Sequence, residues 1–387
     1  NPDLISEKTN AYNIGLDLSL FKNRIELTTE VYLKKIDNLL MQAVLPDYIS
    51  GLISAPWVNA GSMTNKGIEL TLNTVNINKN GLFWKSGLTF SMNRNRITHL
   101  YTDAAAIQGK IGAETFTLTK VGHPAGQFYG YNVIGMFHNE SEFYLKDIQN
   151  NVVLDQEGNK VPIALPKDKN IGVNGIWVGD FIFEDKNKDG KIDEQDRDFI
   201  GNPDPKFILG LNNYLSYKGF DLNIFLNAVY GNKIYNQLRK DFTNPMNNSG
   251  MLKETTGIAL IEMIDPNGSD QDISNVRVSN PNASIQRITV SDANDNSRMS
   301  NRFIEDGSYL RLKNISLGYT FSQNLLKKYQ IENLRLYVNI QNLFTWTKYT
   351  GYDPEIGSYN QNVLLRGIDY ARYPSQRIYT FGLNFMF

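Results

Sequence analysis

Oxygen-bearing side chains recur at alternate positions between residues 185 and 196. An EF-hand loop places its ligands at positions 1, 3, 5, 7, 9 and 12 and needs a glycine at position 6 for its sharp turn. Gly190 stands at that sixth position. The residues at the six ligand positions are Asp185, Asn187, Asp189, Lys191 (through its backbone carbonyl), Asp193 and Asp196. The spacing therefore predicts a site for a hard cation, Ca²⁺ or Mg²⁺.

The surroundings of this loop differ from those of an EF-hand domain. The segment 181–183 before it and the prolines at 203 and 205 after it are not amphipathic helices. Asp196 is also shorter than the glutamate that usually binds calcium through both oxygens at position 12. The interpretation is an isolated metal loop, and the alternative is an acidic, solvated turn held by Asx hydrogen bonds.

No pattern of catalytic residues accompanies the loop. The three histidines, His99, His123 and His138, lie in one long polar stretch without metal-ligand or triad spacing. There is no cysteine, which excludes disulfides and thiolate metal sites, and the net charge of -1 gives no case for nucleic acid. We therefore expect a protein that is not an enzyme and does not bind nucleic acid.

Aromatic residues are abundant, with 21 tyrosines and 20 phenylalanines. Several lie in segments that read as loops and could stack on sugar rings as substrate-binding residues: Tyr129, Tyr131, Trp177, Tyr349, Tyr352 and Tyr359. They could equally pack the loops together or against a partner protein.

Nine segments show period-two alternation of apolar and polar residues, which indicates β-strands with different solvents on their two faces. In the last one, Tyr379, Phe381, Leu383, Phe385 and Phe387 share a face. Each segment is long enough for a tilted membrane strand. The segments are 9–21, 24–37, 66–78, 82–95, 206–218, 219–231, 307–321, 332–345 and 374–387.

The connections between these strands alternate between short and long. Long ones are predicted at 38–65, 97–205, 232–306 and 346–373. Outer-membrane β-barrels have short periplasmic turns and long extracellular loops, and their strands face lipid on one side and a polar lumen on the other. A soluble β-sandwich is the alternative, but it would have to bury residues such as Glu30 and Glu69. The fold class expected is therefore all-β, a transmembrane antiparallel β-barrel.

Three finer predictions follow from the alternation. The strand-like stretch 128–137 would break the alternation of short and long connections, so we expect it outside the barrel. The apolar phase slips at Lys313-Asn314, which indicates a β-bulge. Aromatic residues near strand ends are candidates for the girdles at the membrane interfaces, although ordinary packing could also explain them: Phe21, Trp84, Tyr217, Phe220, Phe321 and Trp346.

Five sequence motifs resemble those of SusC-like TonB-dependent transporters of the Bacteroidetes outer membrane, and they run in the family order from about residue 9 to 387. The motifs are NAGSMTNKGIE at 59–69, VGHPAGQFYGY at 121–131, GDFIFEDKNKDGKID with IGNPDPKF at 179–193 and 200–207, RFIEDGSYLRLKNISLGY at 302–319, and NIQNLF at 339–344.

The resemblance implies that 1–387 is the C-terminal part of a 22-stranded plugged barrel, with the N-terminal plug and TonB box absent from this chain. It implies TonB-dependent import of an oligosaccharide or a peptide, TonB acting through the missing N-terminal part, and a SusD-like surface lipoprotein as a lid. Alternatives are a siderophore or cobalamin receptor and a calcium-stiffened structural or adhesive barrel protein.

Overall fold

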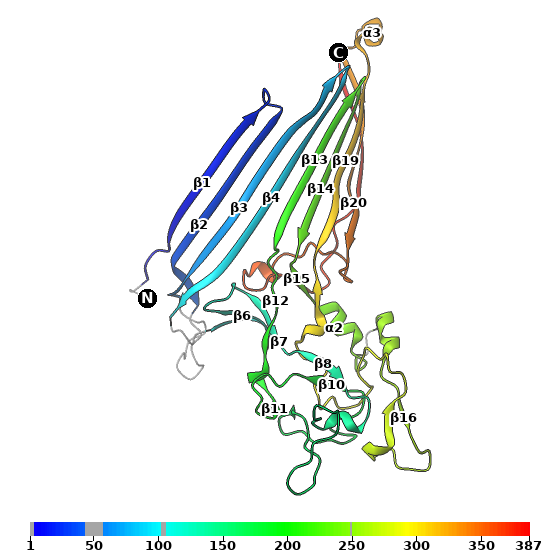
Figure 1. Ribbon diagram of the computed structural model, residues 1–387. Helices are drawn as coiled ribbons and strands as arrows, with labels where there is room; N and C mark the ends of the chain where they lie inside the picture. Colours follow the sequence, from blue (N-terminus) through cyan, green and yellow to red (C-terminus); the bar gives the residue numbers. More distant parts are fainter. Residues whose placement is uncertain (1–3, 43–56, 102–105, 248–249) are drawn as a thin grey trace.

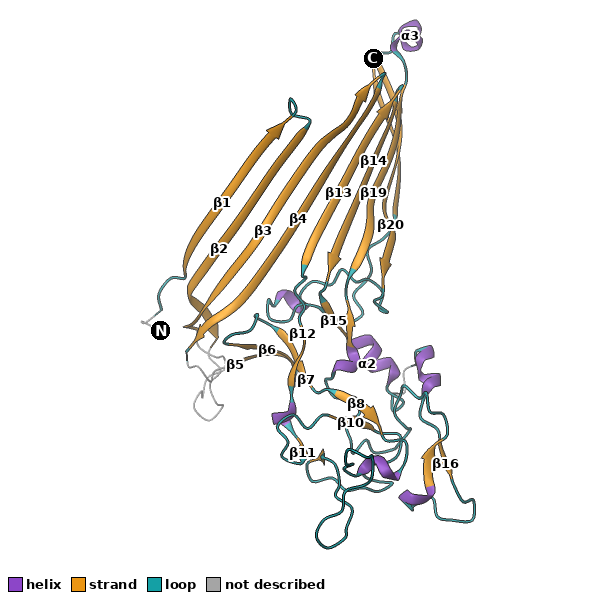
Figure 2. Ribbon diagram, viewed as in Figure 1, coloured by secondary structure: helices purple, strands orange, loops and turns teal. Residues whose placement is uncertain are grey.

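The computed structural model describes residues 4–42, 57–101, 106–247 and 250–387. Nine strands form one antiparallel sheet in the order β1-β2-β3-β4-β13-β14-β19-β20-β22 (Figures 1 and 2). These are the nine predicted segments, so the all-β prediction is confirmed. Their bounds are β1 Lys8–Leu20, β2 Ile25–Gln42, β3 Trp57–Lys79, β4 Leu82–Leu100, β13 Phe207–Tyr217, β14 Phe220–Tyr230, β19 Tyr309–Thr320, β20 Asn333–Thr347 and β22 Ile378–Met386.

The register joins the apolar residues of eight strands into a continuous face, because directly paired residues point to the same side of a sheet. One row consists of Leu18, Leu27, Leu72, Leu88, Leu211, Leu226, Leu312 and Phe344. The adjacent row on the opposite face consists of Asp17, Thr28, Thr71, Thr89, Gly210, Asn227, Arg311 and Thr345. The apolar face is uncovered, with Ile14 80% exposed and Phe381 77% exposed.

Aromatic residues lie at both ends of the sheet, as predicted. At the end with the short turns, Phe220 packs against Tyr319 with ring centroids 4.5 Å apart. At the opposite end, Phe207 stacks on Tyr230 at 5.1 Å and Phe344 lies 6.0 Å from Trp346. The apolar face is thus bordered by two aromatic rows, the arrangement of a membrane-spanning barrel wall.

The predicted bulge in β19 is confirmed. Leu312 pairs with Leu226 and Asn314 with Phe225, so two steps along β19 oppose one step along β14. The extra residue, Lys313, accounts for the phase slip between Leu312 and Ile315.

The predicted boundaries 38–65 and 97–205 need correction. β2 continues to Gln42, β3 begins at Trp57 and β4 ends at Leu100, so these strands extend past the predicted ends of the sheet. The register shifts between Ile36 and Leu39, where Asn38 has a φ of 60°. Such an irregularity disrupts the alternation of side chains, although pairing resumes beyond it. Residues 43–56, within the first predicted loop, lie outside the described residues.

The connections β4–β13, β14–β19 and β20–β22 form small elements of their own at the end of the sheet opposite the short turns (Figure 1). The stretch 128–137 lies there, outside the nine-stranded sheet, as predicted. We call the described residues of the connections β4–β13, β14–β19 and β20–β22 the loop body. Its elements are β5 Ala106–Ile111, β6 Glu114–Lys120, β7 Gln127–Gly130, β8 Val133–Met136, β9 Leu165–Pro166, β10 Phe181–Phe183, β11 Lys191–Ile192, β12 Asp198–Gly201, β15 Lys233–Asn236, α2 Gln237–Thr243, β16 Ile261–Met263, β17 Val276–Val278, β18 Ile304–Asp306 and β21 Ile368–Asp369.

The buried hydrophobic cores lie mainly in the loop body. One core contains Phe137 stacked on Phe143, with centroids 3.9 Å apart, together with Trp177 and Phe183. A second contains Phe116, Phe128, Tyr235 and Phe303. The loop body therefore has packed interiors of its own. Within the described part of the chain, no helix is both long and apolar enough to cross a membrane.

Candidate functional site

A buried ion pair joins the two longest connections of the loop body. The Arg287 guanidinium donates from Nε to Asp180 Oδ1 at 3.0 Å and from Nη2 to Asp180 Oδ2 at 3.3 Å. The same guanidinium donates to the carbonyls of Val173 and Gly175. The side chains of Arg287 and Asp180 are 6% and 1% exposed. This pair thus fixes two segments that are 107 positions apart in the sequence, at a place from which water is excluded.

Asparagine side chains complete this network. Asn296 donates to Asp180 Oδ1 at 3.1 Å and to Asp292 Oδ1 at 2.7 Å, and its own carbonyl oxygen accepts from the Phe181 N–H. Burial raises the pKa of the Asp180 carboxyl above its ordinary value, opposed by the Arg287 charge. The network satisfies polar groups that would otherwise be costly to bury.

A polar pocket of about 580 Å³ opens in the loop body. Three ion pairs line it: Lys240 with Glu114 at 2.6 Å, Arg197 with Glu194 at 2.9 Å, and Arg298 with Asp295 at 3.7 Å. Lys110 and Tyr131 also line it. Charges of both signs beside an aromatic ring can bind a polar oligomer through hydrogen bonds and ring contacts.

Tyr131 of this pocket is held by two arginines. The guanidinium carbon of Arg298 lies 4.8 Å from the ring centroid and that of Arg197 lies 5.9 Å from it. Burial raises the pKa of the Tyr131 hydroxyl to about 12. The hydroxyl is therefore a neutral hydrogen-bonding group at physiological pH.

The other aromatic residues predicted to bind substrate are not brought together in one place. Trp177 is buried in the core with Phe137, and Tyr349 is buried with its hydroxyl donating to Asp369 Oδ2 at 2.6 Å. Tyr129 and Tyr359 are half-buried, whereas Tyr352 is exposed. Tyr131 lines the pocket but is itself 8% exposed and belongs to the same core as Trp177. The burial of Tyr131, Trp177 and Tyr349 fits the packing alternative, and a role in substrate binding remains a prediction.

The predicted metal loop folds around its own backbone N–H groups. Asp185 accepts from the N–H groups of Asp189 and Gly190, at 3.2 and 2.9 Å. Asn187 Oδ1 also accepts from Asp189, at 3.0 Å. Asp196 is 2% exposed and accepts from the Lys186 and Asp193 N–H groups, at 2.9 and 2.7 Å. These are the Asx bonds of the alternative interpretation, and they engage both oxygens of Asp196.

Across the described ranges, no three or more His, Cys, Asp or Glu side chains form a group that could hold a metal ion. The predicted ligand set also contains the Asn187 amide and the Lys191 carbonyl. Ca²⁺ or Mg²⁺ in the 185–196 loop therefore remains a prediction.

A second buried cluster fixes the β20–β22 connection to the polar face of the sheet. Arg311 of β19, 2% exposed, donates to Asp353, to Glu355 Oε2 at 2.8 Å and to Thr345 Oγ1 at 2.9 Å. Asp353 also accepts from the Ser375 N–H at 2.8 Å. The connection thus lies against the face opposite the apolar rows, which is the lumenal side of a barrel.

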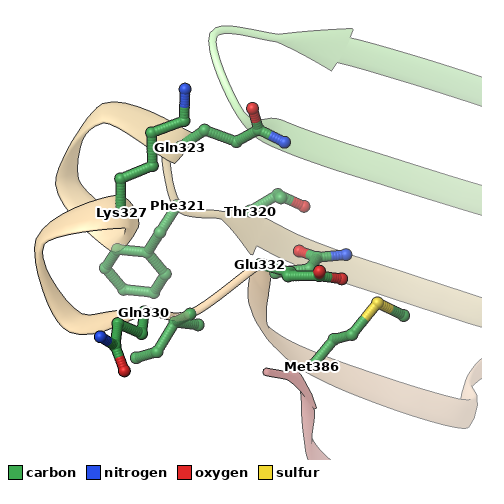
Figure 3. A pocket seen from close by; sticks show the side chains of 9 residues that line it. Thr320, Phe321, Gln323, Lys327, Gln330, Glu332 and Met386 are labelled. Atoms are coloured by element: carbon green, nitrogen blue, oxygen red, sulfur yellow. The ribbon is translucent and has the colours of Figure 1, made fainter.

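Figure 3 shows a pocket of about 670 Å³ at the other end of the sheet, beside the connection that contains α3 (Gln323–Leu326). Phe321, Lys327 and Gln330 come from that connection, and Met386 comes from the end of β22. Lys327 and Glu332 are its only charged lining residues, so it offers no cluster of charges comparable to the loop-body pocket.

Sequence reasoning missed the arginines that organise the loop body. Arg287 and Arg298 lie in a polar stretch without periodicity, and the Asp180 carboxylate and the Tyr131 ring that they contact are distant in sequence. Asp180 and Arg311 did lie within motifs that resembled the transporter family. A carboxylate in GDFIF and an arginine in SYLRLKN, both beside apolar residues, were the available signals of buried charges.

Comparisons with known proteins agree with this architecture. Residues 1–343 match the family model described as TonB dependent receptor-like, beta-barrel. The chain is 32% identical over 398 residues to TonB-dependent receptor P3 of Formosa agariphila and 27% identical over 398 residues to TonB-dependent receptor SusC of Bacteroides thetaiotaomicron. A solved structure of the RagAB peptide transporter superposes with a TM-score of 0.72 at 22% identity, which shows the same fold.

The alignments with P3, SusC and RagAB cover all of this chain but only part of each of those proteins. The chain spans 35% of the P3 receptor, 32% of SusC and 36% of the RagAB chain.

Proposed function

Since the chain belongs to the TonB-dependent receptor β-barrel family and its strands lie in the outer membrane, we propose that it forms part of a transporter importing oligomeric nutrients. The connections 38–65, 97–205, 232–306 and 346–373 would be its extracellular loops, with the first two bounds corrected as above. The periplasmic side is then the end with the short turns.

The observation that carries this proposal is the packed loop body at one end of the sheet. Long loops without a role are uncommon. Here, Arg287 and Asp180 fix two of them together, and Arg311 fixes a third to the lumenal face. A rigid mouth with a charged pocket supports the capture of a polar oligomer before it enters the lumen.

Two partners belong to the proposal. A SusD-like lipoprotein would cover the loop body as a lid, and TonB would supply energy through an N-terminal plug and TonB box outside this chain. The family and the SusC relative support both partners. Import of this kind needs no catalytic side chain in the receptor, and the relatives are named as receptors.

The cargo class is an oligosaccharide or a peptide. The pocket supports either, because its charged side chains can bind peptide termini and charged side chains as well as the hydroxyl groups of a sugar. RagAB is a peptide transporter, which favours testing peptides first.

The test is growth of a strain deleted for the complete receptor and supplied with oligopeptides or oligosaccharides as sole nutrient. The wild-type gene should restore growth on one of these. Lys110→Glu should reduce the uptake rate at limiting cargo several-fold, because it reverses a charge lining the pocket. Lys120→Glu is the control, since it changes an exposed lysine near the end of the same hairpin outside the pocket.

Restoration of siderophore or cobalamin uptake alone would contradict the proposal and favour the alternative receptor class. If Lys110→Glu and Lys120→Glu changed the uptake rate equally, the result would contradict a role of the pocket in uptake.

A further inference from the structure

The outward face of β2, β3 and β4 changes abruptly from apolar to basic toward the loop end. Val31, Ile68 and Met92 form one paired row. The next row of the same face consists of Leu33, Lys66 and Arg94, and the row after it consists of Lys35, Thr64 and Arg96. The three strands therefore carry four cations immediately beyond the apolar face.

This basic surface lies at the height of lipid headgroups. Trp84 marks the aromatic row at the turn end of β4, and Arg94 follows ten residues later. At ~3.4 Å per residue, this is about 34 Å along the strand, or about 26 Å along the membrane normal for a tilt of about 40°. The apolar band of a membrane barrel is about 25 Å tall, so Arg94 is placed at its outer boundary.

The cations line a cavity of about 570 Å³. Lys66, Arg94 and Arg96 form part of its wall together with Leu33. The segment 121–124 forms another side, because Gly122 N–H donates to the Ile97 carbonyl and Ile97 N–H donates to the His123 carbonyl, both at 2.9 Å. The cavity is thus a built recess whose wall combines an apolar residue with three cations.

None of the cavity's cations has a carboxylate partner among the described residues. Arg94 donates to three backbone carbonyls, those of Asn93, Pro205 and Lys206. No carboxylate lines the cavity. The acidic residues Glu30 and Glu69 are paired with each other on the opposite face. Three uncompensated cations at a lipid boundary favour an anionic headgroup.

We propose that Lys66, Arg94 and Arg96 form a binding site for the phosphate of an outer-leaflet glycolipid headgroup, as carried by the lipid A part of lipopolysaccharide. Arginine and lysine bind phosphate through charge-assisted hydrogen bonds, and an acyl chain of the same molecule can lie along Leu33, Ile68 and Met92. The site lies outside the lumen, so it is independent of cargo. It rests on the loop end being the outer end, as proposed above.

The test uses the complete receptor purified in detergent and titrated with phosphorylated lipid A, dephosphorylated lipid A, phosphatidylglycerol or inorganic phosphate. Bound lipid is counted by native mass spectrometry. Wild-type protein should retain phosphorylated lipid A at least about tenfold more strongly than the dephosphorylated form. Inorganic phosphate at the lipid's concentration should not displace it.

The triple variant Lys66→Gln/Arg94→Gln/Arg96→Gln should lose this preference, and Lys66→Arg/Arg94→Lys/Arg96→Lys should keep most of it. A matched control, Lys22→Gln/Lys79→Gln/Lys218→Gln, removes three charges from the turns at the other end of the sheet and should bind as wild type. Heat-modifiable migration on gels checks that each barrel is folded.

Three results would overturn the proposal. The first is that the triple glutamine variant binds phosphorylated lipid A as strongly as the control variant does. The second is that wild-type protein binds phosphorylated and dephosphorylated lipid A equally. The third is that inorganic phosphate at the lipid's concentration displaces the bound lipid A. If the protein preferred phosphatidylglycerol over lipid A, this surface would lie at the inner leaflet and the assigned orientation would be contradicted. If lipid binding were intact but nutrient uptake failed, only the transport proposal would be contradicted.

Discussion

Arg287 and Arg277 show how burial decides what an ion pair contributes. Both are arginines of the β14–β19 connection, each paired with one carboxylate. Arg287 and Asp180 are almost fully buried, whereas the side chains of Arg277 and Glu262 are 57% and 44% exposed. Removing one partner of a buried pair leaves an uncompensated charge in a low-dielectric position, while water compensates the exposed one.

We therefore expect Arg287→Ala to destabilise the loop body by about 3–5 kcal/mol. Arg277→Ala should change its stability by at most about 1 kcal/mol. Hydrogen exchange of residues 173–183 and 285–296 in the complete receptor measures this. Faster exchange in both variants, or in neither, would contradict the role given to the Arg287–Asp180 pair.

The 185–196 loop gives a prediction about metal binding. Ca²⁺ should bind the receptor with the loop's carboxylates as ligands, and Asp185→Asn/Asp189→Asn should abolish that binding because two charged ligands are lost. Asp155 forms a similar Asx turn, accepting from the Glu157 and Asn159 N–H groups, but lacks the ligand spacing. Asp155→Asn is therefore the control.

Calorimetric titration of the complete receptor with Ca²⁺ and then with Mg²⁺ tests the prediction. If Ca²⁺ gave no saturable binding heat, or gave the same heat with the Asp185→Asn/Asp189→Asn variant, the result would favour the solvated turn.

At the scale of elements, the sequence predicted the strands that face lipid on one side and the lumen on the other. All nine sheet strands were predictable because lipid and lumen impose opposite preferences on alternate residues. The outward extension of β2 beyond residue 37 was not, because the register shift at Asn38 removed the alternation while the strands continued to pair. Even the bulge at Lys313 was predictable, since it shifts the phase of an alternation that continues on both sides.

The loop body could not be predicted in the same way. Its strands are only two to seven residues long, too short for a periodic pattern, and its buried Arg287–Asp180 pair joins residues 107 positions apart. Tyr131 and Trp177 illustrate the difficulty, since both were visible as aromatic residues in loops. Whether such a ring faces cargo or a core depends on Arg298, Phe137 and other residues far away in sequence.

Arg311 of β19 should hold the β20–β22 connection against the sheet. Arg311→Ala should release the 350–376 part of the β20–β22 connection from the lumenal face, because Asp353 and Glu355 lose their buried partner at a cost of about 3–5 kcal/mol. Faster hydrogen exchange or protease cleavage in 350–376 would report this. Arg335→Ala is the control, since Arg335 of β20 pairs with Asp221 of β14 near the short turns, at the end of the sheet opposite that connection.

If 350–376 exchanged equally fast in wild type and Arg311→Ala, other contacts would hold the connection. If Arg335→Ala had the same effect as Arg311→Ala, the result would reflect general loosening of the sheet and not the Arg311 cluster.

At the scale of the whole molecule, the membrane wall and the loop body are stabilised by different means. The sheet presents its apolar residues to lipid, so its stability depends on strand pairing and on the bilayer. The loop body has hydrophobic cores and buried ion pairs, like a water-soluble domain. A loop body with its own interior can present a fixed surface to another protein, whereas isolated flexible loops would have to be ordered on binding.

The β16–β17 hairpin is the part of that surface most suited to a protein partner. It lies at the edge of the loop body in Figure 1. The β17 valines are buried, but the apolar residues that flank β16 are exposed, with Leu260 at 59% and Ile264 at 55%. Exposed neighbouring apolar residues favour contact with another protein. We expect the hairpin to contact the proposed lipoprotein lid.

Leu260→Asp/Ile264→Asp should therefore reduce co-purification of the lid about tenfold or more, because two carboxylates would be desolvated in the interface. Ile148→Asp/Leu154→Asp is the matched control, since these residues are 97% and 57% exposed elsewhere on the loop body. Deleting 264–275 is a stronger change that leaves Val276, Val278 and Arg287 in place, so the core of the loop body should survive. If the lid co-purified equally with all these variants, its docking surface would lie elsewhere on the loop body.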